Sequence, residues 1–83
     1  MTNNTHKNLY VPNIGEYDSL ELLDWLIEEG SEFKKGEEIC ELVTDKAVFP
    51  LEAEKKGRLT EICIKAPSKV KIHQIIGKFV YYD

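Results

Sequence analysis

Cysteine and histidine are scarce in this sequence of 83 residues. The two cysteines, Cys40 and Cys63, lie 23 positions apart, with no C-x-x-C pair and no companion histidine cluster. This spacing excludes a disulfide framework and a zinc site. Both cysteines lie among apolar residues of expected strands, so we expect reduced thiols that pack as small hydrophobic side chains.

Long apolar segments are also missing. No run approaches the roughly 18 residues of a membrane span, and no signal-peptide core is present, so we expect a cytoplasmic protein without a membrane partner. No nucleophile–base–acid set, phosphate loop or metal cluster is evident. A domain of this size buries only about 60–65% of its unfolded surface and can hardly enclose a deep pocket as well. These features favour a non-catalytic module that presents something to larger partners.

The net charge of −4 is unevenly distributed. Residues 1–42 carry ten acids and three lysines, whereas residues 43–83 carry five acids and eight bases. A basic half can indicate nucleic-acid binding. Here the basic residues are spaced through alternating apolar positions without a stacking motif. We therefore interpret them as solvated strand faces and expect no nucleic-acid partner.

The chain begins with a polar segment, residues 1–8, for which we expect a flexible tail, and residues 9–83 form the expected single domain. The segment Leu9–Val11 predicts a short strand that Pro12 ends. A turn-rich connection follows, and it contains Gly15, Glu16, Tyr17 and Asp18.

Local and long-range patterns disagree over residues 19–30. Ser19 could cap a helix, Leu20, Leu23 and Ile27 share one helical face, and Gly30 could end it. However, a shift of 37 residues aligns this segment with Leu59–Ile64, whose β-branched alternation predicts a strand. The same shift aligns other residues that share chemical character: Ser31 with Ser68, Lys34 with Lys71, Ile39 with Ile76 and Val43 with Val80. We therefore predict a strand over Leu22–Ile27.

The most informative stretch lies between residues 39 and 51. Two strand-forming runs, Ile39–Val43 and Val48–Leu51, flank Thr44, Asp45 and Lys46. Asp in a tight connection can hydrogen-bond its own backbone, which favours a hairpin with Lys46 at an exposed tip. Pro50 cannot donate to a ladder, so the second strand is expected at a sheet edge or at a bulge.

The residues in and around this hairpin form a recognisable sequence motif. Gly36, Ile39, Asp45-Lys46-Ala47 and a glycine at position 57 resemble the lipoyl-attachment motif of lipoyl domains from 2-oxo-acid dehydrogenase complex acyltransferases. The resemblance covers about residues 9–82. Several positions depart from the usual pattern: Asn13 replaces Asp, Tyr17 replaces a glycine, Val43 replaces a glutamate, His73 replaces a glycine, and Leu51-Glu52 replaces Val-Pro.

The resemblance implies an all-β flattened barrel or sandwich of two four-stranded antiparallel sheets with quasi-twofold symmetry. It implies a lipoyl group amide-linked to Lys46, with Asp45 and Ala47 as flanking recognition residues. The group acts as a swinging arm between active sites of a 2-oxo-acid dehydrogenase complex. The implied partners are a lipoate ligase or lipoyl/octanoyl transferase, a 2-oxo-acid decarboxylase, an acyltransferase core and dihydrolipoamide dehydrogenase. We expect partner choice to lie in Gly15, Glu16, Tyr17 and Asp18.

Two other interpretations stay open at this point. Biotin carrier domains share the expected fold but usually place methionine on each side of the modified lysine, whereas this chain has Met1 alone. An unmodified lipoyl-like module that binds a partner through its acidic half is the other alternative. The chain could equally be a free-standing carrier or the first domain of a longer acyltransferase.

Overall fold

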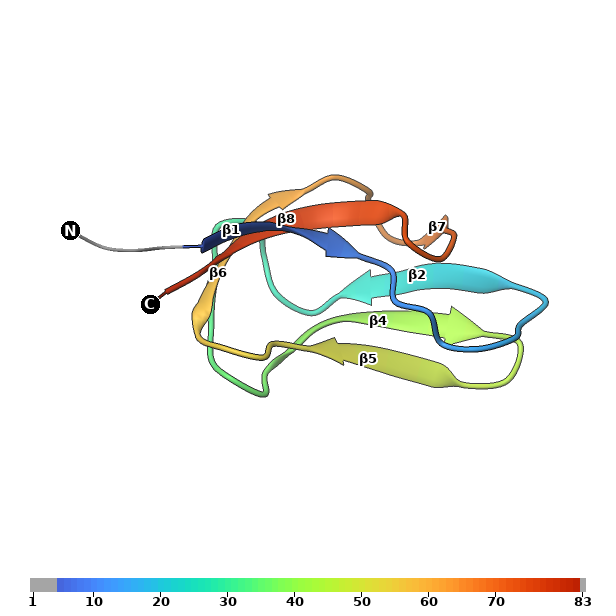
Figure 1. The fold of residues 1–83 in the computed structure, drawn as a ribbon. Coiled ribbons are helices and arrows are strands. Elements are labelled where there is room, and N and C mark those ends of the chain that lie inside the picture. Colours follow the sequence, from blue (N-terminus) through green and yellow to red (C-terminus); the bar gives the residue numbers. More distant parts are fainter. Residues whose placement is uncertain (1–4, 83) are drawn as a thin grey trace.

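Two four-stranded antiparallel sheets face each other across a shared core (Figure 1). A computed structural model describes residues 5–82, and no helix occurs among them. One sheet has the order β1-β8-β6-β3 and the other β5-β4-β2-β7. The predicted all-β sandwich is therefore confirmed. The strands are β1 (Thr5–Tyr10), β2 (Leu20–Trp25), β3 (Glu32–Phe33), β4 (Glu38–Thr44), β5 (Val48–Glu52), β6 (Gly57–Ile62), β7 (Ser68–Lys69) and β8 (Ile75–Tyr81).

The internal repeat is a real structural symmetry. A shift of 37 residues carries the bounds of β2 onto those of β6, and the bounds of β4 onto those of β8. The irregularities repeat as well, because the register of β2 and β4 shifts between Leu22 and Asp24, and that of β6 and β8 between Leu59 and Glu61. Each sheet thus contains the same two central strands with the same bulge.

The core consists of two apolar clusters that this symmetry exchanges. One contains Leu22 and Leu42, and the other contains their equivalents Leu59 and Phe79. Three aromatic rings, Phe33, Phe79 and Tyr81, meet edge to face in the second cluster. Alternating strand residues bury this apolar surface, at roughly 25 cal/mol for each Å² removed from water, and hold the two sheets together.

The helix-like spacing of residues 19–30 has a simple origin in the β-bulge. Leu20 and Leu22 are buried in the normal alternation, but Leu23 is the extra residue of the bulge and is 40% exposed. A bulge inserts one residue and shifts the following side chains by one position. The strand prediction is correct, although β2 begins at Leu20 and ends at Trp25, so Leu26 and Ile27 lie beyond it.

The first strand is longer than expected at its start. The sequence predicts a strand over Leu9–Val11 after a loose tail, whereas β1 begins at Thr5 and ends at Tyr10. The tail prediction is therefore wrong for residues 5–8, and residues 1–4 lie outside the described residues. Residues 5–8 have exposed side chains and are held by backbone pairing with β8, in a register that places Thr5 opposite Tyr81. Backbone pairing leaves no apolar periodicity for sequence analysis to detect.

Three further expectations concern single positions. Pro50 lies in β5, an edge strand, as predicted. Cys40 is buried in β4, and burial, followed by the nearby Glu41 charge, raises the pKa of its thiol to about 12. Cys63, in contrast, is exposed and follows the end of β6, so its prediction as a buried strand residue is wrong. Both cysteines are free thiols.

The side chain of Trp25 joins the two sheets. The indole Nε1 of Trp25, in β2, donates a hydrogen bond to the carbonyl oxygen of Ile64 at 2.9 Å. Gly77 in β8 leaves room for the ring, because a Cβ there would lie 3.0 Å from the Trp25 Cη2 atom. Trp25 therefore contacts both sheets.

The β4–β5 turn and the chain ends lie at opposite ends of the molecule (Figure 1). The terminal strands β1 and β8 pair in the sheet that does not contain the turn. Within residues 5–82 no helix could span a membrane. The same residues contain no cluster of three or more His, Cys, Asp or Glu side chains able to hold a metal ion.

Candidate functional site

A tight turn between β4 and β5 carries Lys46. The last strand pair before it is Val43 opposite Val48, and the Thr44 N–H donates to the Ala47 carbonyl oxygen at 2.8 Å. The Thr44 hydroxyl oxygen accepts hydrogen bonds from the N–H groups of Lys46 and Ala47, both at 3.1 Å. Thr44 thereby fixes the backbone on which the lysine side chain is mounted.

The Lys46 side chain is exposed, as the sequence predicts. Its Nζ lies 3.5 Å from the backbone carbonyl oxygen of Glu16, at the limit of a hydrogen bond. Another enzyme can reach this amine without a conformational change that exposes it. The site therefore fits a group attached covalently through Nζ.

Asp45 connects the hairpin to the loop between β1 and β2. Its Oδ1 accepts the N–H of Asp18 at 2.8 Å and that of Ser19 at 3.4 Å. The Asp18 N–H is the main cause that lowers the pKa of the Asp45 carboxyl, and the Ser19 N–H and the Lys46 charge act in the same direction. The sequence predicts that Asp45 bonds its own turn, whereas its main contacts cross to another loop. In the turn itself Thr44 performs that role.

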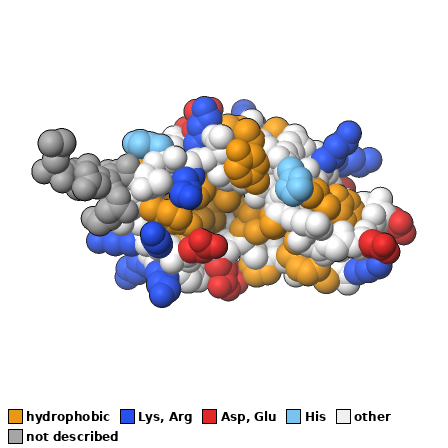
Figure 2. Space-filling model, in the orientation of Figure 1, with side chains coloured by type: hydrophobic (Ala, Val, Ile, Leu, Met, Phe, Trp, Pro, Cys, Tyr) orange, Lys and Arg blue, Asp and Glu red, His pale blue; other side chains and the backbone are white. Residues whose placement is uncertain are grey.

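The loop Gly15, Glu16, Tyr17 and Asp18 lies beside the hairpin. Gly15 has a φ of 96°, a conformation that favours glycine, and its N–H bonds the side chain of Asn13. Glu16 and Asp18 are exposed, but Tyr17 is half-buried and packs against the first core cluster. Much of the Tyr17 ring is thus committed to the domain itself. Figure 2 shows acidic and basic side chains close together at this end of the molecule.

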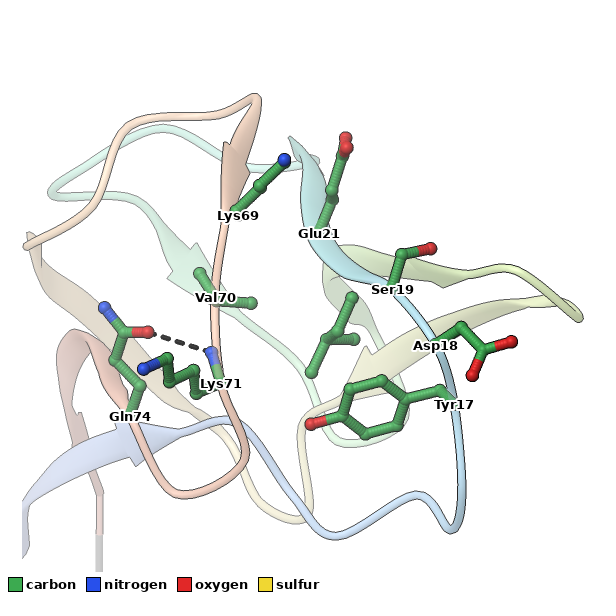
Figure 3. Close-up of a pocket in the computed structure, with 9 residues that line it drawn as sticks. Tyr17, Asp18, Ser19, Glu21, Lys69, Val70, Lys71 and Gln74 are labelled. Carbon is green, nitrogen blue, oxygen red and sulfur yellow. Dashed lines mark hydrogen bonds between the residues drawn. The ribbon is translucent and has the colours of Figure 1, made fainter.

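An open groove of about 490 Å³ adjoins this loop (Figure 3). One wall comes from the loop and the start of β2, and the other from β7 and the connection to β8. The Tyr17 ring points across the groove, whereas the Asp18 carboxylate points away from it (Figure 3). Its lining residues are Tyr17, Asp18, Ser19, Leu20, Glu21, Lys69, Val70, Lys71 and Gln74.

The structure brings the predicted residues into one region, but it adds others that sequence reasoning missed. Thr44 could have been suspected, because Ser and Thr before a turn often bond the backbone two or three residues later. The groove wall from Lys69 to Gln74 had no such signal, since it lies more than 20 residues from Lys46 in the chain. Only the pairing of β7 with β2, with Glu21 opposite Lys69, brings it near the tip.

Comparison with known proteins gives one family. Residues 7–79 match the Biotin_lipoyl family model, described as "Biotin-requiring enzyme". The chain is 38% identical over 57 residues to the dihydrolipoyllysine-residue acetyltransferase component of the pyruvate dehydrogenase complex from Rhizobium meliloti (strain 1021), covering 68% of this chain and 13% of that protein. It is 38% identical over 60 residues to the mitochondrial pyruvate dehydrogenase protein X component of Mus musculus, covering 71% of this chain and 12% of that protein.

The chain thus spans about an eighth of the length of these relatives. The family match covers both sheets and includes the β4–β5 hairpin and the loop before β2. The paired sheets and the exposed lysine turn are consistent with it. The chain belongs to the biotin/lipoyl attachment domain family.

Proposed function

We propose that Lys46 is modified by a lipoyl group and that the domain carries acyl groups and reducing equivalents between enzyme active sites. The observation that supports this most is the exposed lysine at the apex of a turn held by Thr44, with Asp45 on one side and Ala47 on the other. Two relatives named as pyruvate dehydrogenase complex components favour lipoate over biotin. The absence of methionine beside Lys46 points the same way.

The chain's own contribution is to present the amine. A lysine ammonium must lose a proton before its lone pair can attack the carbonyl carbon of an activated acyl donor, whose leaving group then departs. The neighbouring carboxylate of Asp45 is a poor base, because the Asp18 and Ser19 N–H groups that bond its Oδ1 lower its pKa. The base is therefore supplied by the attaching enzyme, a lipoate ligase or a lipoyl/octanoyl transferase.

When attached, a lipoyl group supplies a disulfide that accepts electrons and acyl groups. The domain contributes reach and a high effective concentration at each active site rather than transition-state chemistry. We accordingly propose a non-catalytic carrier, whose partners are a 2-oxo-acid decarboxylase, an acyltransferase core and dihydrolipoamide dehydrogenase. These partners follow from the names of the relatives and from the chemistry of the arm.

The loop of Gly15, Glu16, Tyr17 and Asp18 is the proposed surface for choosing the decarboxylase. An exposed arm is generic, so discrimination needs a second surface near the tip, and Glu16 and Asp18 offer charge that steers a basic partner. The loop touches the turn through both Lys46 and Asp45. Replacing Glu16, Tyr17 and Asp18 with alanine should leave lipoylation intact and lower the rate of reductive acylation. An unchanged rate in a folded variant would move specificity elsewhere.

Intact mass spectrometry of the protein from its native source tests the modification itself. We expect a lipoyl increment that disappears in Lys46→Ala, while stability changes by no more than about 0.5 kcal/mol, the usual scale for an exposed side chain. Lys35→Ala, which removes another exposed turn lysine, is the matched control and should keep the increment. A biotinyl increment, or a lipoyl increment that survives in Lys46→Ala, contradicts the proposal.

A further inference from the structure

One hydroxyl oxygen holds both peptide units that flank the Cα of Lys46. The Lys46 N–H belongs to the peptide unit before that Cα, and the Ala47 N–H belongs to the one after it. Both donate to the Thr44 Oγ1 at 3.1 Å. Because peptide units are planar, each residue has only two soft backbone rotations, φ on one side of its Cα and ψ on the other. The Thr44 hydroxyl therefore restrains both rotations of Lys46.

The turn has no proline or glycine to set its shape, since residues 44–47 read Thr-Asp-Lys-Ala. In many turns the N–H of the fourth residue donates to the backbone carbonyl oxygen of the first, whereas the Ala47 N–H donates to the Thr44 side chain. The bond from the Thr44 N–H to the Ala47 carbonyl oxygen joins the two ends of the turn and does not involve the N–H groups inside it. The Asp45 Oδ1 accepts N–H groups of another loop. The backbone conformation of Lys46 thus depends on the Thr44 hydroxyl.

The backbone conformation of Lys46 decides the direction in which its side chain leaves the turn, because the position of Cβ follows from the backbone around it. The rest of the side chain is exposed and flexible, so it can adapt inside an enzyme. The attaching enzyme must bring an activated carbonyl carbon to Nζ, where an amide bond forms as the leaving group departs. A turn that already has the accepted conformation does not have to be ordered when the enzyme binds, which favours binding.

We propose that Thr44 is a positioning residue for the acylation of Lys46, because its hydroxyl holds the lysine backbone in the conformation that the attaching enzyme binds. This inference rests on the proposed lipoylation. Thr44 takes no part in the bond-forming step, since its hydroxyl contacts backbone groups of the turn, whereas Nζ contacts the Glu16 carbonyl oxygen. Loss of the hydroxyl should therefore weaken recognition of the chain without slowing the reaction of the bound complex.

Steady-state kinetics with a purified lipoate ligase, lipoate and ATP test this, with the full chain as the varied substrate and mass spectrometry as the readout. Thr44→Val replaces the hydroxyl with a methyl group of similar size, and Thr44→Ala is a second variant without it. If such a variant holds the accepted conformation for about a tenth of the time, its KM rises about tenfold while kcat stays the same. Thr44→Ser, which keeps the hydroxyl, should retain the original KM. Thr60→Val, which changes an exposed threonine of β6, is the matched control and should do the same.

Amide hydrogen exchange of the unmodified chain measures the restraint itself and needs no ligase. The amides of Lys46 and Ala47 should exchange roughly tenfold faster in Thr44→Val, because they lose the oxygen to which they donate. Both should return to the slower rate in Thr44→Ser. The amide of Leu42, which is buried in β4, should exchange at the same rate in every variant. Far-UV circular dichroism verifies that the variants are folded.

The outcomes separate this inference from the proposed function. An unmutated chain that gains no lipoyl increment contradicts the proposed function, and unchanged exchange of the Lys46 and Ala47 amides in Thr44→Val overturns the restraint by Thr44 on its own. A chain that is lipoylated with the same KM before and after Thr44→Val overturns the positioning role alone. An equal rise of KM in Thr44→Ser and Thr44→Val would assign the effect to the side chain's shape. A fall in kcat at unchanged KM would place Thr44 in the chemical step, and either result also overturns the inference.

Discussion

The hairpin of β4 and β5 is equivalent by the internal symmetry to the pair of β8 and β1. The two pairs nevertheless differ in what they carry. Each consists of a central strand and an edge strand in the same antiparallel arrangement. In the first, Val43 and Val48 lead into a turn that bears Lys46. In the second, Thr5 and Tyr81 lie opposite each other in the first and last strands of the described chain. The strands are duplicated, but the β4–β5 turn is not, because β8 and β1 are not joined by a turn. The reactive lysine lies in this unduplicated turn.

The equivalents of the site residues show how far the two halves have diverged. The position equivalent to Asp45 is Tyr82, whose hydroxyl accepts a hydrogen bond from the Arg58 Nε at 3.1 Å. Asp45 instead holds a neighbouring loop through backbone N–H groups. Equivalent core positions such as Leu22 and Leu59, or Leu42 and Phe79, keep apolar side chains. The symmetry therefore maintains the fold, whereas the asymmetry creates the site.

The largest effect should come from the matched core leucines. Leu22→Ala and Leu59→Ala each remove a fully buried side chain at equivalent positions, and each should cost about 2–5 kcal/mol of unfolding free energy. Chemical denaturation followed by far-UV circular dichroism measures both. If the halves are equivalent in energy as well as geometry, the two losses agree within about 1 kcal/mol. A much smaller loss in one variant would show that one cluster supplies most of the stability.

A smaller effect of opposite sign should separate Gly36 from its equivalent, His73. Both adopt the left-handed conformation, with φ of 85° and 70°. Side chains other than glycine cost roughly 1–2 kcal/mol there. Gly36→Ala should therefore destabilise by about 1 kcal/mol. His73→Gly should stabilise by about 0.5 kcal/mol, because the added flexibility of the unfolded chain offsets part of the relief.

The same thermal or chemical unfolding experiment tests both substitutions. A destabilised His73→Gly would mean that the imidazole contributes contacts larger than the backbone strain. Gly36→Ala without loss of stability would mean that the turn accommodates a different conformation. Either result would break the equivalence of the two turns.

The smallest effect should be a local one at low pH. The folded state lowers the pKa of Asp45, so its carboxylate stabilises the loop contact above the unfolded value of 3.8. That contribution is lost as the pH falls through the lower folded value. The amide signals of Asp18 and Ser19 should accordingly titrate with a midpoint below 3.8. In Asp45→Asn, which keeps an acceptor oxygen but cannot ionise, this titration should vanish. A midpoint at or above 3.8 would contradict the assignment.

The sequence was sufficient for the parts of this fold that bury apolar side chains. The alternation in Leu59–Ile64, together with the 37-residue shift, identified β2 as a strand against a local helical pattern, and the position of Lys46 followed from its flanking strands. The exposed amine and the loop beside it were both placed correctly. Binary patterning predicts such features because burial alternates along a strand.

The remaining features depend on contacts that produce no recognisable pattern in a single sequence. The first four residues of β1 pair with β8 through their backbone, and their side chains are exposed. The extra residue Leu23 resembled part of a helical face because a bulge disrupts the alternation. The partners of Asp45 lie 26 and 27 residues away in the chain. The groove wall at Lys69–Gln74 became part of the site only through the pairing of β7 with β2.

The position of Trp25 gives the domain a built-in optical reporter. It is the single tryptophan of the chain, its ring lies against Gly77 in the opposite sheet, and its indole donates to the Ile64 carbonyl oxygen. Separation of the sheets would expose the ring to water and quench or red-shift its fluorescence. In β2 the residue paired with the tip end of β4 is Leu20, opposite Thr44, whereas Trp25 lies at the other end, opposite Cys40. The fluorescence of Trp25 should therefore change when the domain unfolds and stay the same when Lys46 is acylated.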